Sequence, residues 1–278
     1  MLIAGAVCPH PPLLIPAALG SAASDPPAEL REVASAAALA VSGLAGARPD
    51  VIVVVGGGAA EREYGAGASG GLHAFGIGVT VGPGEPVLPL SLTVGRWLLE
   101  RAGILARDET PDPAGGLAGA GAWLPGETRP GLPAEPMSVP GDEAASGIAV
   151  VFQEVASDAA AGECLKLGRI LADRAPRVAL LAMGDACARP AREDPDVPDP
   201  AARDYDADVA EALAAADARW LARLDPALDD ELVVAGRAAW QVLAGAARGA
   251  RMQGRLLCMS APYGVTYLVA SWEQCRTD

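Results

Sequence analysis

The stretch that decides the fold is residues 50–58, DVIVVVGGG, in which five successive β-branched residues follow Asp50 and three glycines close the run. Such a run is typical of a strand buried on both faces of a sheet. Apolar residues at helical spacing precede it over residues 27–47, and residues 2–8 predict an earlier buried strand that ends in a proline-rich turn. The order strand, helix, strand indicates an α/β unit.

The same alternation continues toward the C-terminus. Helices are predicted over residues 90–102, 159–175, 205–224 and 229–247, and strands over residues 147–152, 177–183, 255–259 and 265–272. The pattern predicts an α/β fold in a single domain, residues 1–278, with a central mostly parallel or mixed sheet flanked by helices. Residues 107–142 are rich in Gly and Pro and predict an irregular segment, either a linker or a lid.

Composition narrows the classes of function. Lys+Arg number 21 against 35 Asp+Glu, which gives a net charge of −14 and excludes a binder of bare nucleic acid. No charged leader and no apolar run of membrane-spanning length is seen, so neither a signal peptide nor a membrane partner is predicted. Five cysteines without C-x-x-C spacing favour a reducing, cytoplasmic location. A small-molecule ligand and a homo-oligomer both remain open.

Candidate site residues follow three predicted strands, since sites in open α/β sheets gather beyond the carboxyl ends of the strands. They are, in chain order, Cys8, His10, Gly56, Gly57, Gly58, His73, Asp185 and Cys187. The chain has only two histidines, and an imidazole can bind a metal or act as a general base. The same residues have plainer interpretations, because a loop histidine can bond a carbonyl group and a buried cysteine usually only fills space.

Residues 4–16, AGAVCPHPPLLIP, resemble the opening of the catalytic chain in the class III extradiol ring-cleavage dioxygenase superfamily. In that family the first strand ends in a histidine that binds non-haem Fe(II). Residues 50–58, 179–185 and 261–267 resemble the second strand, the strand before the catalytic histidine, and the closing hairpin. The resemblance implies the family's fold and an oxidoreductase ancestry, with iron held by two histidines and one carboxylate.

The family's site carries over only in part. His10 matches the first iron ligand, whereas Gly56–Gly58 stand where a second histidine is expected. Ala188 stands at the place of the catalytic histidine, and Gln241, counted from an Ala-Gly pair, at the place of the carboxylate. A neutral carboxamide is a poor substitute for a carboxylate on Fe(II). The resemblance therefore implies a divergent member with a degraded metal site.

Two functions stay open at this point, and neither assigns a catalytic residue. In the first, the chain is a pseudoenzyme without ring-cleavage activity or cofactor. It binds a small molecule or a partner in the ancestral cleft, lined by Cys8, Gly56, Gly57, Gly58, Cys187 and Gln241. In the second, it is a metal-dependent oxidoreductase of the non-haem iron dioxygenase type, acting on a catechol-like or other small aromatic substrate. His10, His73 and Asp185 would then hold Fe(II) or another divalent metal.

Overall fold

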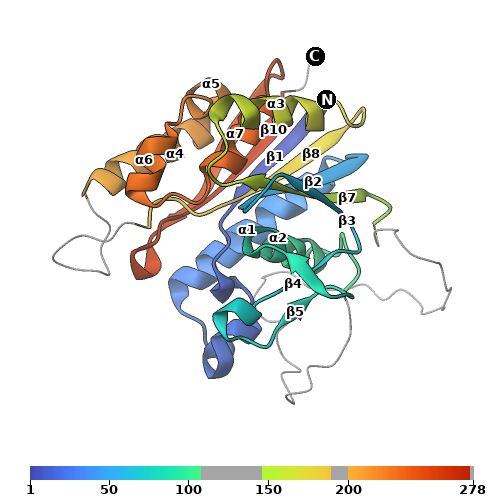
Figure 1. Ribbon diagram of the computed structural model, residues 1–278, viewed down its shortest axis with the longest axis vertical. Coiled ribbons are helices and arrows are strands. Elements are labelled where there is room, and N and C mark those ends of the chain that lie inside the picture. Colours follow the sequence, from blue (N-terminus) through green and yellow to red (C-terminus); the bar gives the residue numbers. More distant parts are fainter. Residues whose placement is uncertain (108–145, 189–199, 276–278) are drawn as a thin grey trace.

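The strand predicted from the valine run lies near the middle of a seven-stranded sheet (Figure 1). The computed structural model describes residues 1–107, 146–188 and 200–275. Strand β2 (Val51–Gly58) is buried over its first six residues, and the strand order is β3-β7-β2-β8-β1-β10-β9. The residues of β2 contribute alternately to the hydrophobic cores on the two faces of the sheet, because successive side chains of a strand point to opposite faces. Val53 and Val55 belong to one core, and Ile52 and Val54 belong to the other.

The sheet is mixed, which confirms the predicted fold class. Strands β7 (Ala149–Ala156), β2, β8 (Val178–Met183) and β1 (Leu2–Cys8) pair in parallel. The pairs β3–β7, β1–β10 and β10–β9 are antiparallel; the bounds are β3 (Arg62–Gly65), β9 (Met252–Ser260) and β10 (Tyr267–Gln274). Strands from both sides of residues 108–145 therefore belong to one sheet.

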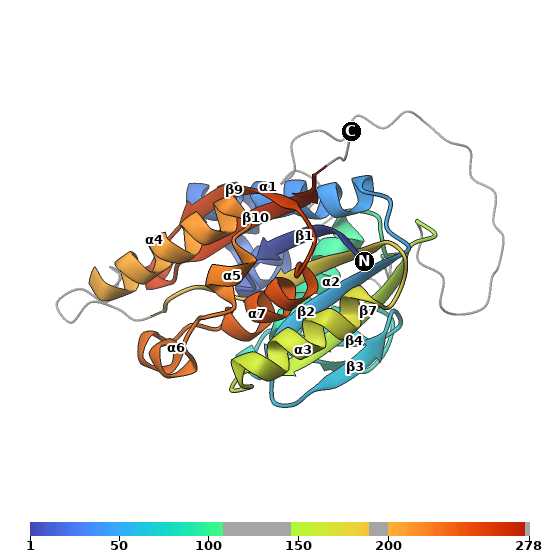
Figure 2. The same cartoon turned by 90° about the horizontal axis from the view of Figure 1, so that it is seen from above.

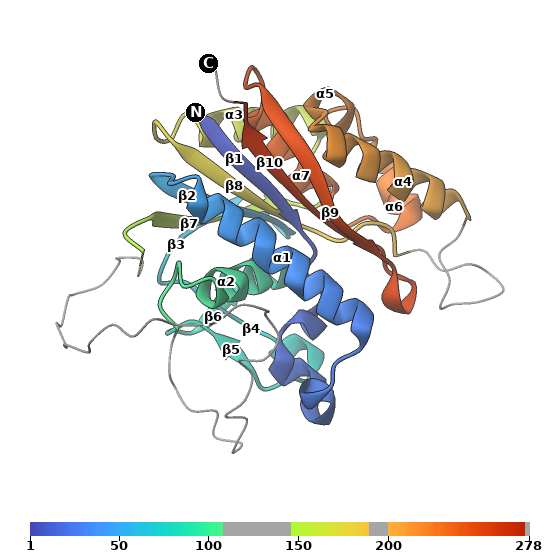
Figure 3. The same cartoon turned by 180° about the vertical axis from the view of Figure 1, so that it is seen from behind.

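Helices cover both faces of the sheet. Helices α1 (Ala28–Gly46) and α2 (Leu90–Arg101) pack on one face (Figure 3). Helices α3 (Ala161–Ala172), α4 (Pro200–Ala215) and α7 (Arg237–Ala246) contribute to the core on the other (Figure 2). None of the described helices is long and apolar enough to span a membrane.

The predictions of one long helix over residues 205–224 and another over residues 229–247 are wrong, because each segment is divided between two helices. The segment 205–224 divides into α4 and α5 (Ala218–Leu221), since Ala216 adopts a positive φ of 51° and Asp217 caps α5. The segment 229–247 divides into α6 (Pro226–Leu232) and α7, with Val233 at φ 56°. The helical spacing of apolar residues continues through both breaks, so it does not reveal them. The residues with left-handed backbone conformation are Ala216 and Val233, whereas glycine normally marks such turns.

Residues 62–88 form structure that no pattern predicted. A small sheet has the order β5-β4-β6; its strands are β4 (Ser69–Gly71), β5 (Thr80–Val81) and β6 (Pro86–Leu88). Buried Arg96 of α2 holds the chain before β4, since its guanidinium donates to the carbonyl groups of Ala66 and Ala68 at 2.5 and 2.8 Å.

Short 3-10 turns cover residues 12–14, 16–24, 73–75 and 262–264. The predicted irregular segment 107–142 lies almost entirely outside the described residues.

Candidate functional site at the carboxyl edge

After the neighbouring strands β1 and β8, the chain continues to helices on opposite faces of the sheet. β1 is followed by α1 on one face, whereas β8 is followed by α4 on the other. Such a switch point between neighbouring parallel strands is where α/β sheets open to ligands. The two loops are tied together at their start, because the N–H of Gly184 donates to the carbonyl of Cys8 at 3.0 Å. His10 and Asp185, which follow these strands, are therefore brought together.

His10 and Asp185 form the centre of the site. The backbone N–H of His10 donates to Oδ1 of Asp185 at 2.7 Å, and the imidazole Nδ1 lies 3.7 Å from the same oxygen. Both side chains are largely buried, with 14% and 15% exposed. Burial raises the pKa of the Asp185 carboxyl, an effect that His10 partly offsets. Nδ1 of His10 is buried and has no hydrogen-bond partner among the described residues.

Two tyrosines complete the site, and sequence reasoning missed both. Residues 186 and 187 pair with Thr266 through backbone hydrogen bonds of 2.9 and 3.0 Å, which places Tyr267 beside Asp185. Burial raises the pKa of Tyr267, and the nearby Asp185 and Tyr263 raise it further. Tyr263 is exposed and adopts φ 60°, an unusual conformation for a bulky residue that often marks functional sites. We call His10, Asp185, Tyr263 and Tyr267 the carboxyl-edge cluster.

The three glycines of β2 serve packing in this structure. A Cβ on Gly56–Gly58 would come within 3 Å of side-chain atoms of Ser91, Ser157 and Glu154 respectively. Ser91, at the start of α2, also donates from its hydroxyl to the carbonyl of Gly57 at 2.8 Å. The glycines therefore allow close approach of three side chains at the end of the strand.

The two cysteines predicted to line the site are fully buried. Burial raises the pKa of both thiols, so neither Cys8 nor Cys187 is activated as a nucleophile. The backbone N–H of Cys187 donates to Oδ1 of Asp206 at 3.0 Å. Cys187 also pairs with Val234 in an isolated β-bridge. These contacts fix the loop after β8 rather than present a reactive sulfur.

The donor set does not fit the iron site that the family resemblance implies. Within residues 1–107, 146–188 and 200–275, no three His, Cys, Asp or Glu side chains lie close enough together to hold a metal ion. The structure brings His10 and Asp185 together, but His73 lies exposed in a 3-10 turn beside the small sheet and does not join them. Gln241 is fully buried and held by other protein groups. One imidazole and one carboxylate fall short of a two-histidine, one-carboxylate set.

Gln241 belongs to a buried polar network that sequence reasoning also missed. Its amide donates to the carbonyl of Leu224 at 2.9 Å and accepts from Arg237 at 3.1 Å. Arg237 also pairs with Asp229 (2.7 Å) and donates to two backbone carbonyl groups in the loop after β7, at 2.6 Å each. Asp229 in turn accepts from the Tyr205 hydroxyl at 2.6 Å. The network joins α4, α6 and α7 to the loop after β7 and to the backbone at Leu224.

Asp229 makes stability depend on pH. Burial raises the pKa of its carboxyl from 3.8 to about 6, although Tyr205 and Arg237 lower it. A raised pKa stabilises the fold below pH 4, and this contribution is lost as the pH rises through about 6. We expect wild type to lose on the order of 2–3 kcal/mol of unfolding free energy relative to Asp229→Asn between pH 4 and 7. Urea unfolding at several pH values measures this, and parallel pH profiles would contradict it.

Comparison with known proteins adds little to this geometry. No known protein family matches the chain, and no curated protein matches it. Among solved structures, it is similar to an uncharacterized protein of Escherichia coli K12, JW3007, with 15% identity and a TM-score of 0.45 over 98% of this chain and 99% of that one. The dioxygenase resemblance therefore rests on the sequence motifs alone.

Proposed function

We propose that the chain is a divergent, non-cleaving relative of the class III extradiol dioxygenases that binds a small hydroxylated aromatic molecule at the carboxyl-edge cluster. The observation that carries the proposal is the buried Nδ1 of His10, which has no hydrogen-bond partner among the described residues and lies 3.7 Å from Oδ1 of Asp185. A buried polar atom without a hydrogen bond is destabilising, and a ligand hydroxyl would satisfy it.

The cluster offers complementary groups for such a ligand. Nδ1 of His10 can accept a proton or a hydrogen bond, and the Asp185 carboxyl can accept or donate according to its protonation state. Burial raises the pKa of the Asp185 carboxyl. Tyr263, which is exposed, adds aromatic surface for a ring. The family motif at residues 4–16 supports an aromatic ligand, because the related enzymes act on catechols.

Catechol binding is expected to depend on His10 and Asp185 and not on a metal. Isothermal titration with catechol in EDTA should give one site. We expect His10→Gln and Asp185→Asn each to weaken it about tenfold or more, the effect of losing a hydrogen bond to a charged or strongly polar group. His73→Gln is the matched control, since it removes the other histidine, and should leave the affinity unchanged.

Three results would overturn the proposal. Oxygen uptake by Fe(II)-supplied protein with catechol, lost in His10→Gln, would establish the metal-dependent oxidoreductase instead. Equal binding by wild type and both site variants would place the ligand elsewhere. If catechol does not bind but a protein partner does so through the same residues, the site binds a partner and the small-molecule proposal fails.

A further inference from the structure

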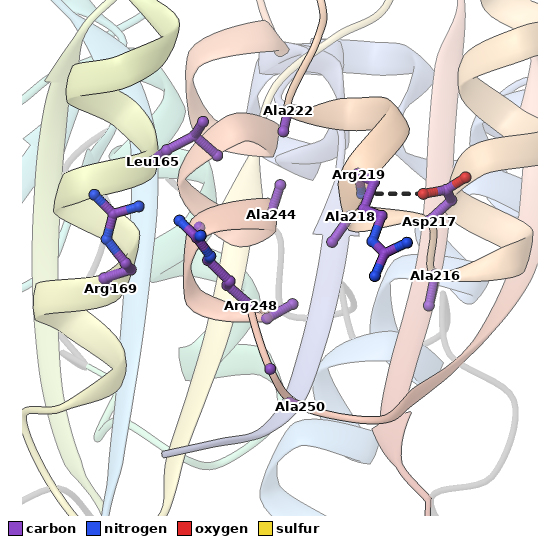
Figure 4. Close-up of a pocket in the computed structure, with 13 residues that line it drawn as sticks. Leu165, Arg169, Ala216, Asp217, Ala218, Arg219, Ala222, Ala244, Arg248 and Ala250 are labelled. Atoms are coloured by element: carbon purple, nitrogen blue, oxygen red, sulfur yellow. Dashed lines mark hydrogen bonds between the residues drawn. The ribbon is translucent and has the colours of Figure 1, made fainter.

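A cavity of about 740 Å³ lies at the opposite, amino edge of the sheet. Helix α3 returns from the end of β7 to this edge, where the amino group of Met1 donates to the carbonyl of Ala172 at 2.5 Å. The cavity lies between α3, α5 and α7, with the residues that follow α7 closing it (Figure 4). Its volume is typical of pockets that bind small molecules.

Three arginines from three segments line this cavity. Arg169 comes from α3, Arg219 from α5, and Arg248 from the turn after α7 (Figure 4). The one acidic lining residue, Asp217, is already engaged, because its Oδ1 accepts from the backbone N–H groups of Arg219 and Trp220 at 3.0 and 2.9 Å. The lining is thus strongly cationic in a chain whose net charge is −14.

These arginines lack the carboxylate partners that the two buried arginines have. Arg96 and Arg237 are both paired with carboxylates at less than 3 Å. Within the described part of the chain, the guanidinium groups of the three cavity arginines form no ion pair or hydrogen bond. A cation in the last turn of a helix is favourable, and both Arg169 of α3 and Arg219 of the four-residue α5 lie in a last turn.

Two walls of the cavity pack closely against each other, and the cavity has room for a ligand. Helices α3 and α7 cross closely at glycines, since a Cβ on Gly245 would lie 2.8 Å from the Cα of Leu165. The walls between the arginines consist of small residues such as Ala218, Ala222 and Ala244. These leave space for an uncharged group beside the cationic rim.

We infer that this cavity binds a phosphorylated small molecule. Three arginines and one aspartate give the cavity lining a net charge of about +2. This charge is complementary to the charge of about −2 on a phosphate monoester near neutral pH. Guanidinium groups bind phosphate oxygens in a bidentate manner. The phosphate lies among Arg169, Arg219 and Arg248, and the organic part of the molecule lies against the alanine wall. This inference is independent of the function proposed for the carboxyl edge.

Titration with pyrophosphate at physiological salt tests the inference. We expect binding at one site, weakened about tenfold or more by each of Arg169→Gln, Arg219→Gln and Arg248→Gln, as for loss of a charge-assisted hydrogen bond. Arg255→Gln is the matched control, because it removes the same charge from an exposed residue of β9 that does not line the cavity. It should leave the affinity unchanged. All three cavity arginines are exposed, so unfolding temperatures without ligand should stay near that of wild type.

A second variant separates the cavity from general surface charge. Ala218→Phe fills the cavity without changing the net charge and is expected to abolish binding of adenosine diphosphate, the larger probe. The inference is overturned if pyrophosphate does not bind. It is also overturned if Arg255→Gln weakens binding as much as the cavity variants, or if Ala218→Phe binds both probes like wild type.

Discussion

Replacing Arg237 by methionine is expected to lower the free energy of unfolding by roughly 3–5 kcal/mol at pH 7.5. The side chain is only 3% exposed and binds Asp229, Gln241 and two backbone carbonyl groups. Its loss leaves the buried Asp229 carboxylate without its ion-pair partner and the side-chain oxygen of Gln241 and two backbone carbonyl groups without this donor, which is strongly destabilising. Urea unfolding followed by circular dichroism gives the value.

Two further variants show whether the effect comes from the network. Arg31→Met removes an arginine of the surface pair with Asp25, whose side chains are 51% and 89% exposed, and should cost at most about 1 kcal/mol. Adding Asp229→Leu to Arg237→Met should restore part of the loss, because the orphaned charge is removed. A loss for Arg237→Met no larger than that for Arg31→Met would contradict the assignment.

Replacing Gly168 by alanine is expected to destabilise the protein by about 3 kcal/mol, at the upper end of the range for overpacking. Gly168 lies where α3 crosses α7, and a Cβ there would overlap the carbonyl oxygen of Val242 and lie 2.7 Å from the backbone N of Ala246. Backbone atoms cannot turn away as a side chain can, so the helices must separate. Thermal unfolding measures the effect.

Gly43→Ala is the matched control for this prediction. Gly43 lies inside α1, and a Cβ there meets nothing within 4 Å. The same substitution should then stabilise the protein by about 0.5–1 kcal/mol, through helix propensity alone. A stabilising effect of both substitutions would show that α3 and α7 do not cross at the close distance their glycines allow.

The sheet was predictable from sequence because its strands carry strong local signals. β1 has the bounds that the sequence predicts, Leu2–Cys8, and the valine run forms β2. The small sheet was not predictable, since strands of two or three residues containing Gly and Pro have no periodicity. The helix breaks at Ala216 and Val233 were also hidden, because their positive φ values depend on tertiary contacts and not on residue type.

The site was only partly predictable. The strand-end rule and the motif at residues 4–16 made His10 and Asp185 candidate residues, and the structure brings these two together without His73. Tyr263 and Tyr267 join them through pairing of distant segments, which spacing along the chain does not reveal. The same is true of Gln241, whose position on α7 suggested a ligand but whose contacts are those of a buried structural network.

The measurement that tests the central claim most directly is an NMR titration of the histidine side chains with catechol in the presence of EDTA. The chain contains only His10 and His73, so two sets of imidazole signals are expected, and His73→Gln assigns them. We predict that catechol shifts the His10 signals and leaves those of His73 in place. His10 signals that do not move, or that move only after a divalent metal is added, would contradict a metal-independent ligand site at His10 and Asp185.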